Sequence, residues 1–286
     1  MKKLLFQLDT DPIANTFDTV VAYDGGADHV TQLAGMTPDN VGPAIDGAIF
    51  TRSPKNKKYT ALFVTGSNMA EGEALLKRIR KHFFGNFSVS VMIDSNGSNT
   101  TAAAAVAYVT KHVSAAGKKA VVLAGTGPVG QRAGVMLARE GAEVVLTSRK
   151  EDRATAAAND MNESFGVNLT GAAAFDDDST NAVLEGAHIV LATGAAGITL
   201  LKEEHWKDHP TLEFLSDANA TPPLGIEGID MMDKGKEVHG KICYGAIGFG
   251  ALKLEVHRAC IARLFEANDQ VFDADEVYAL AKEMAH

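Results

Sequence analysis

One short glycine-rich turn restricts the fold of this chain more than any other feature. Residues 120–124 form an apolar run rich in β-branched side chains, with the length of a buried strand. The sequence GTGPVG follows at once, and an amphipathic run over residues 131–140 ends before a second apolar segment begins. Strand, glycine turn, helix and strand in this order are the context in which a GxGxxG motif binds a dinucleotide. We therefore predict a Rossmann dinucleotide-binding domain that starts in mid-chain.

Each glycine of the turn has its own physical task. Gly125 permits a tight turn, Gly127 leaves room for a pyrophosphate, and Gly130 lets the helix pack closely on the strand. The start of the helix offers unpaired N–H groups and a partial positive charge to the phosphates. A glycine-rich turn without any ligand is the alternative. The turn residues predicted to bind the cofactor are Gly125, Thr126, Gly127, Pro128, Val129 and Gly130.

The end of the second strand indicates which dinucleotide binds. NAD sites usually place a carboxylate there for the ribose 2′-hydroxyl. This chain instead has Ser148, Arg149 and Lys150, with no carboxylate before Glu151. A carboxylate would repel a 2′-phosphate, whereas a hydroxyl and a guanidinium bind it through charge-assisted hydrogen bonds. We predict NADP as the cofactor; a solvated basic strand end is the alternative.

Two further turns are expected to contribute to the cofactor site. Thr193, Gly194 and Ala195 directly follow a predicted strand at residues 188–192. Asn219 lies in the polar segment after another predicted strand at residues 212–215. In open α/β sheets, ligands bind at the carboxyl ends of the strands, which is where these turns fall.

The bulk properties exclude several classes of protein. The chain has 286 residues, of which 46% are hydrophobic, and a formal net charge of −9. That charge argues against nucleic acid or an anionic membrane surface as the main partner. No apolar stretch approaches the ~20 residues that span a bilayer. The two cysteines have no metal-ligand spacing, which fits a reducing cytoplasm.

Strand and helix patterns alternate throughout, which indicates an α/β fold with helices on both faces of largely parallel sheets. We expect an N-terminal α/β substrate domain over residues 1–110, with C-terminal helices from residues 252–286 packing back on it. The Rossmann domain would occupy residues 111–251. In the first domain we expect a helix that starts at Thr37 and Pro38, and strands that include residues 3–8, 49–50, 61–64 and 88–93.

A polar segment, DSNGSNTT at residues 94–101, separates the two predicted domains and precedes an alanine-rich helix. Junction loops are common places for binding pockets. A long helix-capping loop is the alternative, because Ser, Asn and Thr all cap helices well. The residues of this segment that we expect to bind substrate are Asn96, Ser98, Asn99, Thr100 and Thr101.

Several segments together resemble one enzyme family. They are YDGGADH from Tyr23, TPDNVG from Thr37, DSNGSNTTAAA from Asp94, GKKAVVLAGTGPVG from Gly117, PPLGIEGID from Pro222 and GALKLEVHRACIARLFE from Gly250. The chain closely resembles the NADP-dependent methylene-tetrahydromethanopterin dehydrogenases of methylotrophic bacteria. The resemblance implies a cytoplasmic one-carbon enzyme of methanol utilization that forms homo-oligomers, with a trimer favoured. It implies oxidation of methylene-tetrahydromethanopterin to the methenyl form, and some relatives also accept methylene-tetrahydrofolate.

This chemistry fits the absence of an acid–base constellation. A methylene carbon between two nitrogens can lose a hydride directly, and the nitrogen lone pairs stabilise the cation. Catalysis would then rest on geometry and on carboxylates near the developing charge. The candidates are Asp24, which we assign to substrate binding, with Asp94 and Asp217; a turn-capping role is the alternative for each.

Two departures from related families affect the expected site. Folate cyclohydrolases pair a lysine with a tyrosine, and Tyr108 and Lys111 do not form that motif, so we expect no cyclohydrolase activity. The resemblance also implies a lysine where this chain has Glu255, and Lys253 would partly replace it. The expected catalytic group is therefore Asp94, Lys253 and Glu255.

Two other functions remain open from the residues alone. A shikimate- or glutamate-type dehydrogenase shares the two-domain plan but needs an acid–base lysine in the first domain. An NADP-binding sensor without catalysis is the second alternative. Asp176, Asp177 and Asp178 could mimic a metal site, but consecutive carboxylates point in different directions, so we expect no metal.

Overall fold

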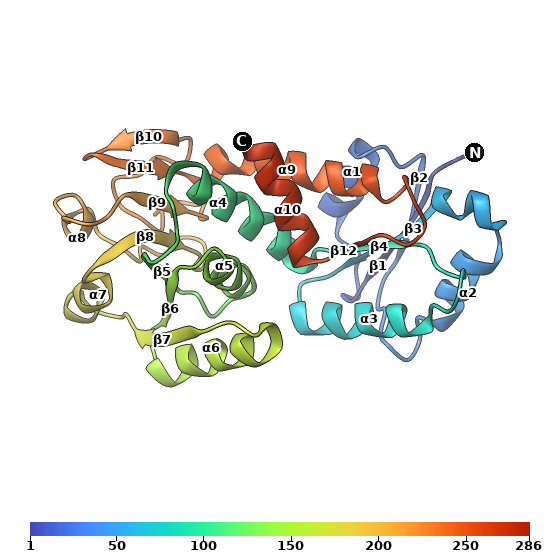
Figure 1. Ribbon diagram of the computed structural model, residues 1–286, viewed down its shortest axis with the longest axis horizontal. Coiled ribbons are helices and arrows are strands. Elements are labelled where there is room, and N and C mark those ends of the chain that lie inside the picture. Colours follow the sequence, from blue (N-terminus) through green and yellow to red (C-terminus); the bar gives the residue numbers. More distant parts are fainter. The chain divides into compact units, whose positions relative to one another are not determined.

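The computed structural model describes residues 1–286 and divides them into two compact units, each built around its own sheet (Figure 1). Unit 1 comprises Met1–Thr100 and Leu254–Leu280, and unit 2 comprises Thr101–Lys253 and Ala281–His286. The mixed α/β class with two domains is therefore confirmed. The boundary expected at residue 110 falls inside α4 (Ser98–His112), and residues 281–286 group with the second unit.

Unit 1 contains a five-stranded sheet in which every pairing is parallel. The C-terminal segment contributes one edge strand, with Val271 paired to Val91, so the chain returns to its first sheet as expected. From edge to edge the strands are β12 (Val271–Phe272), β4 (Ser90–Ile93), β3 (Thr60–Thr65), β1 (Leu4–Asp9) and β2 (His29–Leu33).

Helices cover both faces of this sheet. On one face, α2 (Gly42–Phe50) and α3 (Met69–His82) bury Ile45 and Leu75 in a core with strand residues such as Leu62. On the other face, the Phe63 ring meets His257 of α9 (Ala246–Arg263) edge-on at 5.3 Å between ring centroids. The remaining helical segments of this unit are α1 (Thr16–Asp24), the 3-10 turns η1 (Pro54–Tyr59) and η2 (Ser95–Gly97), the first residues of α4 and most of α10 (Ala274–Ala285).

Two local predictions for unit 1 were wrong. Residues 49–50 belong to helix α2, because Ile45, Ala48 and Ile49 recur at helical spacing and are all buried. That helix begins at Gly42 and not at Pro38. Thr37 instead forms a turn in which its backbone N–H donates to the Asn40 side chain at 2.8 Å.

Unit 2 contains a seven-stranded sheet that is parallel except for one antiparallel edge pair. The sequence carries no signal for that pair, because no side chain of β10 is buried and the strand shows no apolar run. From edge to edge the strands are β10 (Lys234–Val238), β11 (Lys241–Tyr244), β9 (Phe214–Asp217), β8 (Ala187–Ala192), β5 (Lys119–Leu123), β6 (Glu143–Ser148) and β7 (Leu169–Ala173).

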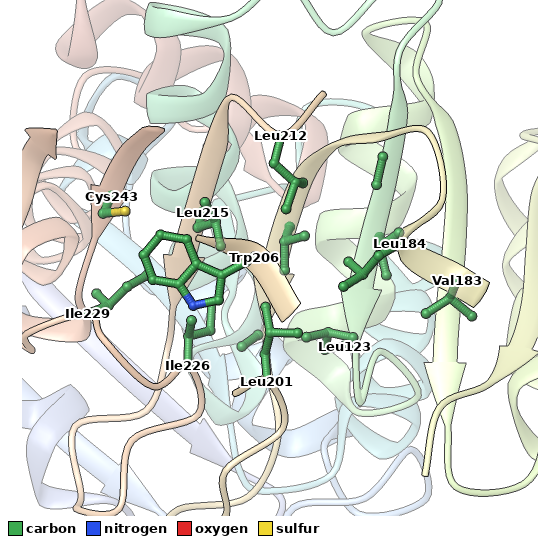
Figure 2. Close-up of a cluster of buried hydrophobic side chains, with 14 residues drawn as sticks. Leu123, Val183, Leu184, Leu201, Trp206, Leu212, Leu215, Ile226, Ile229 and Cys243 are labelled. Carbon is green, nitrogen blue, oxygen red and sulfur yellow. The ribbon is translucent and has the colours of Figure 1, made fainter. Parts of the chain in front are cut away.

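The core of unit 2 gathers around the only tryptophan of the chain. Trp206 is fully buried and packs among Leu215, Ile226 and Cys243 (Figure 2). Its indole N–H donates to the Glu227 carbonyl at 2.9 Å, which satisfies the one polar group of the ring. The helices of this unit are α5 (Pro128–Arg139), α6 (Glu151–Phe165), α7 (Asp177–Leu184) and α8 (Glu203–Trp206), together with most of α4, the start of α9 and the end of α10.

The order of the strands in unit 2 fixes where a ligand can bind. Strand β5 lies between β6 and β8, and the chain extends from β5 toward β6 in one direction and later from β8 in the other. The helices that follow β5 and β8 therefore diverge at the carboxyl ends of these two strands. Such a switch point leaves a crevice for ligands. None of the helices combines the length and apolar character that crossing a bilayer would require.

Candidate functional site

The glycine turn lies at this switch point. Strand β5 ends at Leu123, and α5 begins at Pro128 with Gly127 as its N-cap and no side chain capping it. A Cβ at Gly130 would lie 2.6 Å from the Gly125 Cα, and a Cβ at Gly125 would lie 2.8 Å from the Val122 carbonyl oxygen. The turn and the helix therefore pack together with no space for larger residues.

Gly127 differs from its two neighbouring motif glycines, because a Cβ there would meet nothing within 4 Å. The backbone at Gly127 is open on the side where α5 starts, so a phosphate can approach the uncapped N–H groups of the helix. This geometry agrees with the tasks assigned to the three glycines from the sequence, and it fits a dinucleotide pyrophosphate.

A cavity of about 300 Å³ opens beside the turn and runs along the carboxyl ends of β5, β6 and β8. Seven of the residues expected at the cofactor site line it: Thr126, Gly127, Ser148, Arg149, Thr193, Gly194 and Ala195. Six expected residues are not part of its lining: Gly125, Pro128, Val129, Gly130, Lys150 and Asn219. The four in the turn shape the backbone, so their expected role is indirect in this geometry.

Arg153 lines the same cavity, although the sequence analysis did not name it. It lies in the first turn of α6, four residues after Arg149, and both side chains are exposed. The N-cap of this helix, Lys150, makes no side-chain capping hydrogen bond. A cation in the first turn of a helix opposes the helix dipole, and a bound anion removes that penalty. The four-residue spacing after Arg149 was the signal that could have identified Arg153.

Apolar residues complete the lining. Ala174, Ile198 and Leu200 border the cavity, and Ile198 is 51% exposed. An exposed branched side chain at a cavity mouth suits contact with a flat aromatic ring such as a purine. These three residues could not be predicted from the sequence, because single apolar side chains in a turn form no recognisable motif.

Asn219 has a structural task in the segment after β9. Its Nδ2 donates to the Pro223 carbonyl at 3.0 Å, and its Oδ1 accepts from the Thr221 N–H at 2.8 Å. Both polar ends of this buried side chain hold the 219–223 loop, and the expected contact between Asn219 and the cofactor stays a prediction.

Asp217 organises the same loop from the end of β9. Its two carboxylate oxygens accept from the N–H groups of Asn219 at 2.9 Å and Ile226 at 3.0 Å. Burial raises the pKa of this carboxyl, while hydrogen bonds from backbone N–H groups, including those of Asn219 and Ile226, oppose the rise. The capping interpretation of Asp217 fits these contacts.

The polar segment 94–101 is not the extended loop that the sequence suggested. A 3-10 turn covers Ser95–Gly97, and α4 begins at Ser98, so Ser98, Asn99, Thr100 and Thr101 form its first turn. Asp94 is fully buried and accepts from the N–H groups of Asn99 at 2.9 Å and Thr100 at 3.1 Å, and from the Thr100 hydroxyl at 2.6 Å. These contacts satisfy the first amides of α4, which is why the helix starts early.

This geometry changes the role expected of Asp94. Its carboxylate has no exposed face and acts on the helix start, so a direct contact with a reacting carbon is not available to it here. Ser98, Asn99 and Thr100 are also buried and Thr101 is half-buried, whereas Asn96 is exposed at the tip of the turn with a positive φ of 55°. Asn96 is therefore the member of this segment whose side chain is best placed to meet a ligand.

The remaining expected site residues lie on or beside helices. Asp24 ends α1, and its Oδ2 accepts from the Arg258 guanidinium at 3.0 Å. Lys253 is half-buried and Glu255 is exposed, and both belong to α9. Residues two apart on a helix do not face each other, so these two side chains cannot act as a contacting pair.

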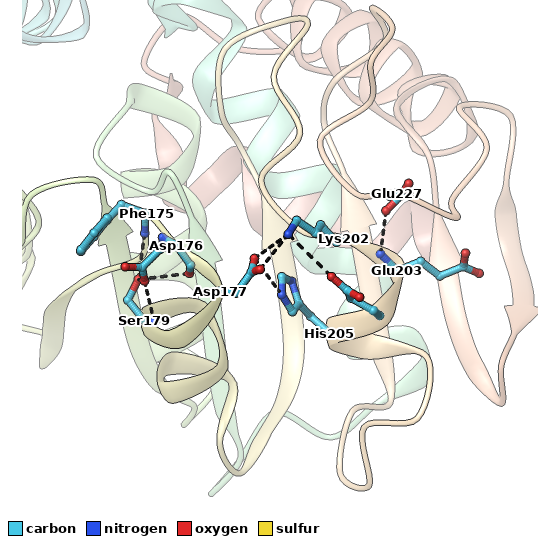
Figure 3. Close-up of polar contacts among 9 residues, drawn as sticks. Phe175, Asp176, Asp177, Ser179, Lys202, Glu203, His205 and Glu227 are labelled. Carbon is cyan, nitrogen blue, oxygen red and sulfur yellow. Dashed lines mark hydrogen bonds and ion pairs between the residues drawn. The ribbon is translucent and has the colours of Figure 1, made fainter.

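The acidic run before α7 is a helix start with an ion-pair cluster (Figure 3). Asp176 and Ser179 form a capping box. Asp177, Glu204 and His205 place ligand atoms within 4.8 Å of one another, but the Lys202 ammonium lies 2.8 Å from Asp177 and 3.6 Å from Glu204. The hydrogen bond from Lys202 lowers the pKa of Asp177. The Lys202 ammonium thus supplies, from the chain itself, the positive charge beside these carboxylates.

Comparison with known proteins places this arrangement in a family. Residues 16–96 match the family described as methylene-tetrahydromethanopterin dehydrogenase, N-terminal. The bifunctional protein MdtA of Methylorubrum extorquens is 57% identical over 286 residues, covering 99% of each chain. The NAD(P)-dependent methylenetetrahydromethanopterin dehydrogenase of the same organism is 30% identical over 279 residues, covering 94% of each chain.

Solved structures share the fold at low identity. Shikimate 5-dehydrogenase from Listeria monocytogenes aligns with a TM-score of 0.52 at 15% identity, covering 98% of this chain and 96% of the other. Ornithine carbamoyltransferase from Gloeobacter violaceus aligns with a TM-score of 0.55 at 12% identity, covering 92% and 86%. These two likenesses concern the fold alone. The identity over the whole length to the two Methylorubrum proteins shows that the chain belongs to the methylene-tetrahydromethanopterin dehydrogenase family.

Proposed function

We propose that this protein oxidises methylene-tetrahydromethanopterin to the methenyl form by direct hydride transfer to NADP. The 57% identity over the full chain to a relative of this family carries the proposal. The open backbone at Gly127 and the arginines of the adjoining cavity support the cofactor assignment. The enzyme is an oxidoreductase, and its relative is named as NAD(P)-dependent.

The chain's own residues hold the cofactor and do not need to move a proton. Bound NADP supplies a nicotinamide ring that accepts the hydride. The uncapped start of α5 binds the pyrophosphate, and Arg149 with Arg153 binds the 2′-phosphate. A hydride leaving a carbon between two nitrogens requires no general base, so the contribution of the protein is to hold the two reactants close and aligned.

A shikimate- or glutamate-type dehydrogenase is less well supported by the lysines of unit 1. Lys57 is the lysine of this unit that is fully buried, and burial lowers its pKa. It lies directly before β3, at the amino end of the parallel sheet, where its ammonium donates to the Asn86 carbonyl at 2.8 Å and contacts the Phe87 ring. Ligands of such sheets bind at the opposite, carboxyl edge.

Three finer points complete the proposal. The enzyme also accepts methylene-tetrahydrofolate, as the resemblance of the sequence implies, and the name of the bifunctional relative at 57% identity fits two activities. It works in the cytoplasm, as the resemblance of the sequence implies. It assembles into a homo-oligomer, with a trimer favoured, and size-exclusion chromatography with light scattering would measure that assembly.

A substrate panel tests the reaction. The purified protein is given NADP with methylene-tetrahydromethanopterin, methylene-tetrahydrofolate, shikimate or glutamate, and absorbance records methenyl-pterin and NADPH together. We expect equal amounts of the two products with the methylene-pterins and no NADPH with the other compounds. NADPH from shikimate or glutamate would contradict the proposal, and NADP binding without any turnover would favour the sensor.

A further inference from the structure

Three loops follow neighbouring strands at the carboxyl edge of the unit 1 sheet. Residues 10–15 follow β1, residues 66–68 follow β3, and residues 94–97 follow β4. The strand order β4-β3-β1 makes these loops adjacent, because all three strands are parallel. The exposed Asn96 lies in the third of them.

A buried carboxylate lies under the first two loops. Asp9 is fully buried, and its Oδ2 accepts from the Thr65 hydroxyl and the Asn15 N–H, each at 2.8 Å. Its Oδ1 accepts from the Asp11 N–H at 2.9 Å. Gln7, also fully buried, donates from Nε2 to the Asn15 carbonyl at 3.0 Å. The carboxylate therefore fixes both ends of the 10–15 loop and connects it to β3.

This network continues to Asn96. The Thr10 N–H donates to the Thr65 carbonyl at 3.2 Å, which joins the first loop to the end of β3, where the second loop begins. The Asn96 N–H then donates to the Gly66 carbonyl at 2.6 Å, which joins the second loop to the third. Gly66 has a φ of +124°, and a Cβ there would lie 2.0 Å from the Thr10 hydroxyl oxygen. The three loops are thus held with little space for adjustment.

The buried network of Gln7, Asp9 and Thr65 is not expected from the needs of folding alone. Burying a charged group is unfavourable unless it is fully hydrogen-bonded, and Asp9 is fully buried. What the polar residues add is a fixed position for each loop. In a hydride transfer that depends on geometry, a displacement of about 1 Å costs about 10²-fold in rate.

We propose that Asp9 is a positioning residue, which acts through Thr65 and Gly66 to hold Asn96 against the bound pterin. The inference rests on the proposed function, since it assumes that a pterin is the ligand of this edge. The exposed amide of Asn96 can donate to and accept from the polar edge of a pterin ring, which carries both kinds of group. Asp9 itself touches neither reactant.

Two Thr65 variants separate positioning from stability. Thr65→Val keeps the shape of the buried side chain but removes the hydroxyl that donates to Asp9, whereas Thr65→Ser keeps that hydroxyl. We expect Thr65→Val to lower kcat/KM for the methylene-pterin roughly 10- to 100-fold, with KM for NADP unchanged. Thr65→Ser retains most of the activity. Asp9→Asn, which turns an acceptor into a donor, gives a loss at least as large as that of Thr65→Val.

The control and a second readout distinguish the possible outcomes. Asp28→Asn is the matched control, because Asp28 is exposed and accepts from the Lys3 N–H on the amino side of the same sheet. Hydrogen exchange at residues 94–97 should accelerate in Thr65→Val and not in Thr65→Ser or Asp28→Asn. Equal kcat/KM for the two Thr65 variants, or a loss explained by the folded fraction alone, would overturn the inference. Failure of the unaltered protein to oxidise any methylene-pterin would instead defeat the proposed function, and the inference with it.

Discussion

At the scale of single residues, selectivity for NADP is expected to depend on two arginines four residues apart in the sequence. Arg149 follows β6 and Arg153 lies in the first turn of α6, and both line the cavity beside the glycine turn. Arg149 could be predicted from the sequence, because no carboxylate stands at the end of the strand where NAD sites usually have one. The second became evident only when the helix start and the cavity were placed together.

Arg149→Ala and Arg153→Ala should each weaken NADP far more than NAD. A hydrogen bond to a charged group contributes about 1.5–3 kcal/mol, so we expect roughly 10- to 100-fold in Kd for NADP and little change for NAD. Binding titrations with both dinucleotides measure this ratio. Lys234→Ala is the control, because Lys234 is an exposed lysine on the edge strand β10 and does not line the cavity. Equal losses for NADP and NAD would refute the assignment of the 2′-phosphate.

Glu255 is expected to affect binding or turnover of the pterin and not binding of the cofactor. It is exposed on α9, at the position where the resemblance implies a lysine. Glu255→Lys should change turnover or the preference between methanopterin and folate substrates, because it reverses a charge where a cation is expected. Steady-state kinetics with both substrates measure the effect, with Glu266→Lys as an exposed control of the same charge change. An unchanged kinetic profile would show that this position is remote from the pterin.

At the scale of elements, the ends of strands and the starts of helices determine which polar residues face a ligand and which bind the backbone. Asp94 begins the turn after β4 and caps α4, while Asp217 ends β9 and holds the following loop. The sequence identified both as carboxylates at strand ends and left open whether they act on ligands or on turns. Their contacts favour the turns, because backbone N–H groups at these ends need acceptors when water is excluded.

The loop after β9 should respond to pH through Asp217. Burial raises the pKa of Asp217 above its ordinary value of 3.8, so the folded protein holds this proton more tightly than the unfolded chain. Ionisation of Asp217 therefore lowers the free energy of unfolding as pH rises from about 3.8 through the raised pKa. Asp217→Asn removes this dependence, and it costs about 1–3 kcal/mol because its amide faces a backbone N–H.

Urea unfolding at several pH values measures the expected difference. The cost of Asp217→Asn should be largest at the acidic end of the range and should shrink as pH approaches neutrality. Asp208→Asn, at an exposed position, is the control. Parallel pH profiles for the unaltered protein and Asp217→Asn would contradict the assignment.

At the scale of the whole molecule, alternation of strands and helices predicted two α/β domains and the return of the C-terminal segment to the first. Strands β2, β10, β11 and β12 were missed. β2 and β10 are edge strands with few buried side chains, β11 has only four residues and β12 only two. Runs this short or this exposed give no clear periodic signal, so pairing with a neighbouring strand decides them.

The sequence by itself determined the glycine turn, the cofactor class and the family. These depend on local backbone geometry and on residues close together in the chain, and such features can be recognised from order and spacing alone. Only the tertiary structure decided which polar residues act on the protein itself. Asp9, Thr65 and Asn96 are far apart in sequence, and they connect because parallel strands bring their carboxyl ends to one edge of a sheet.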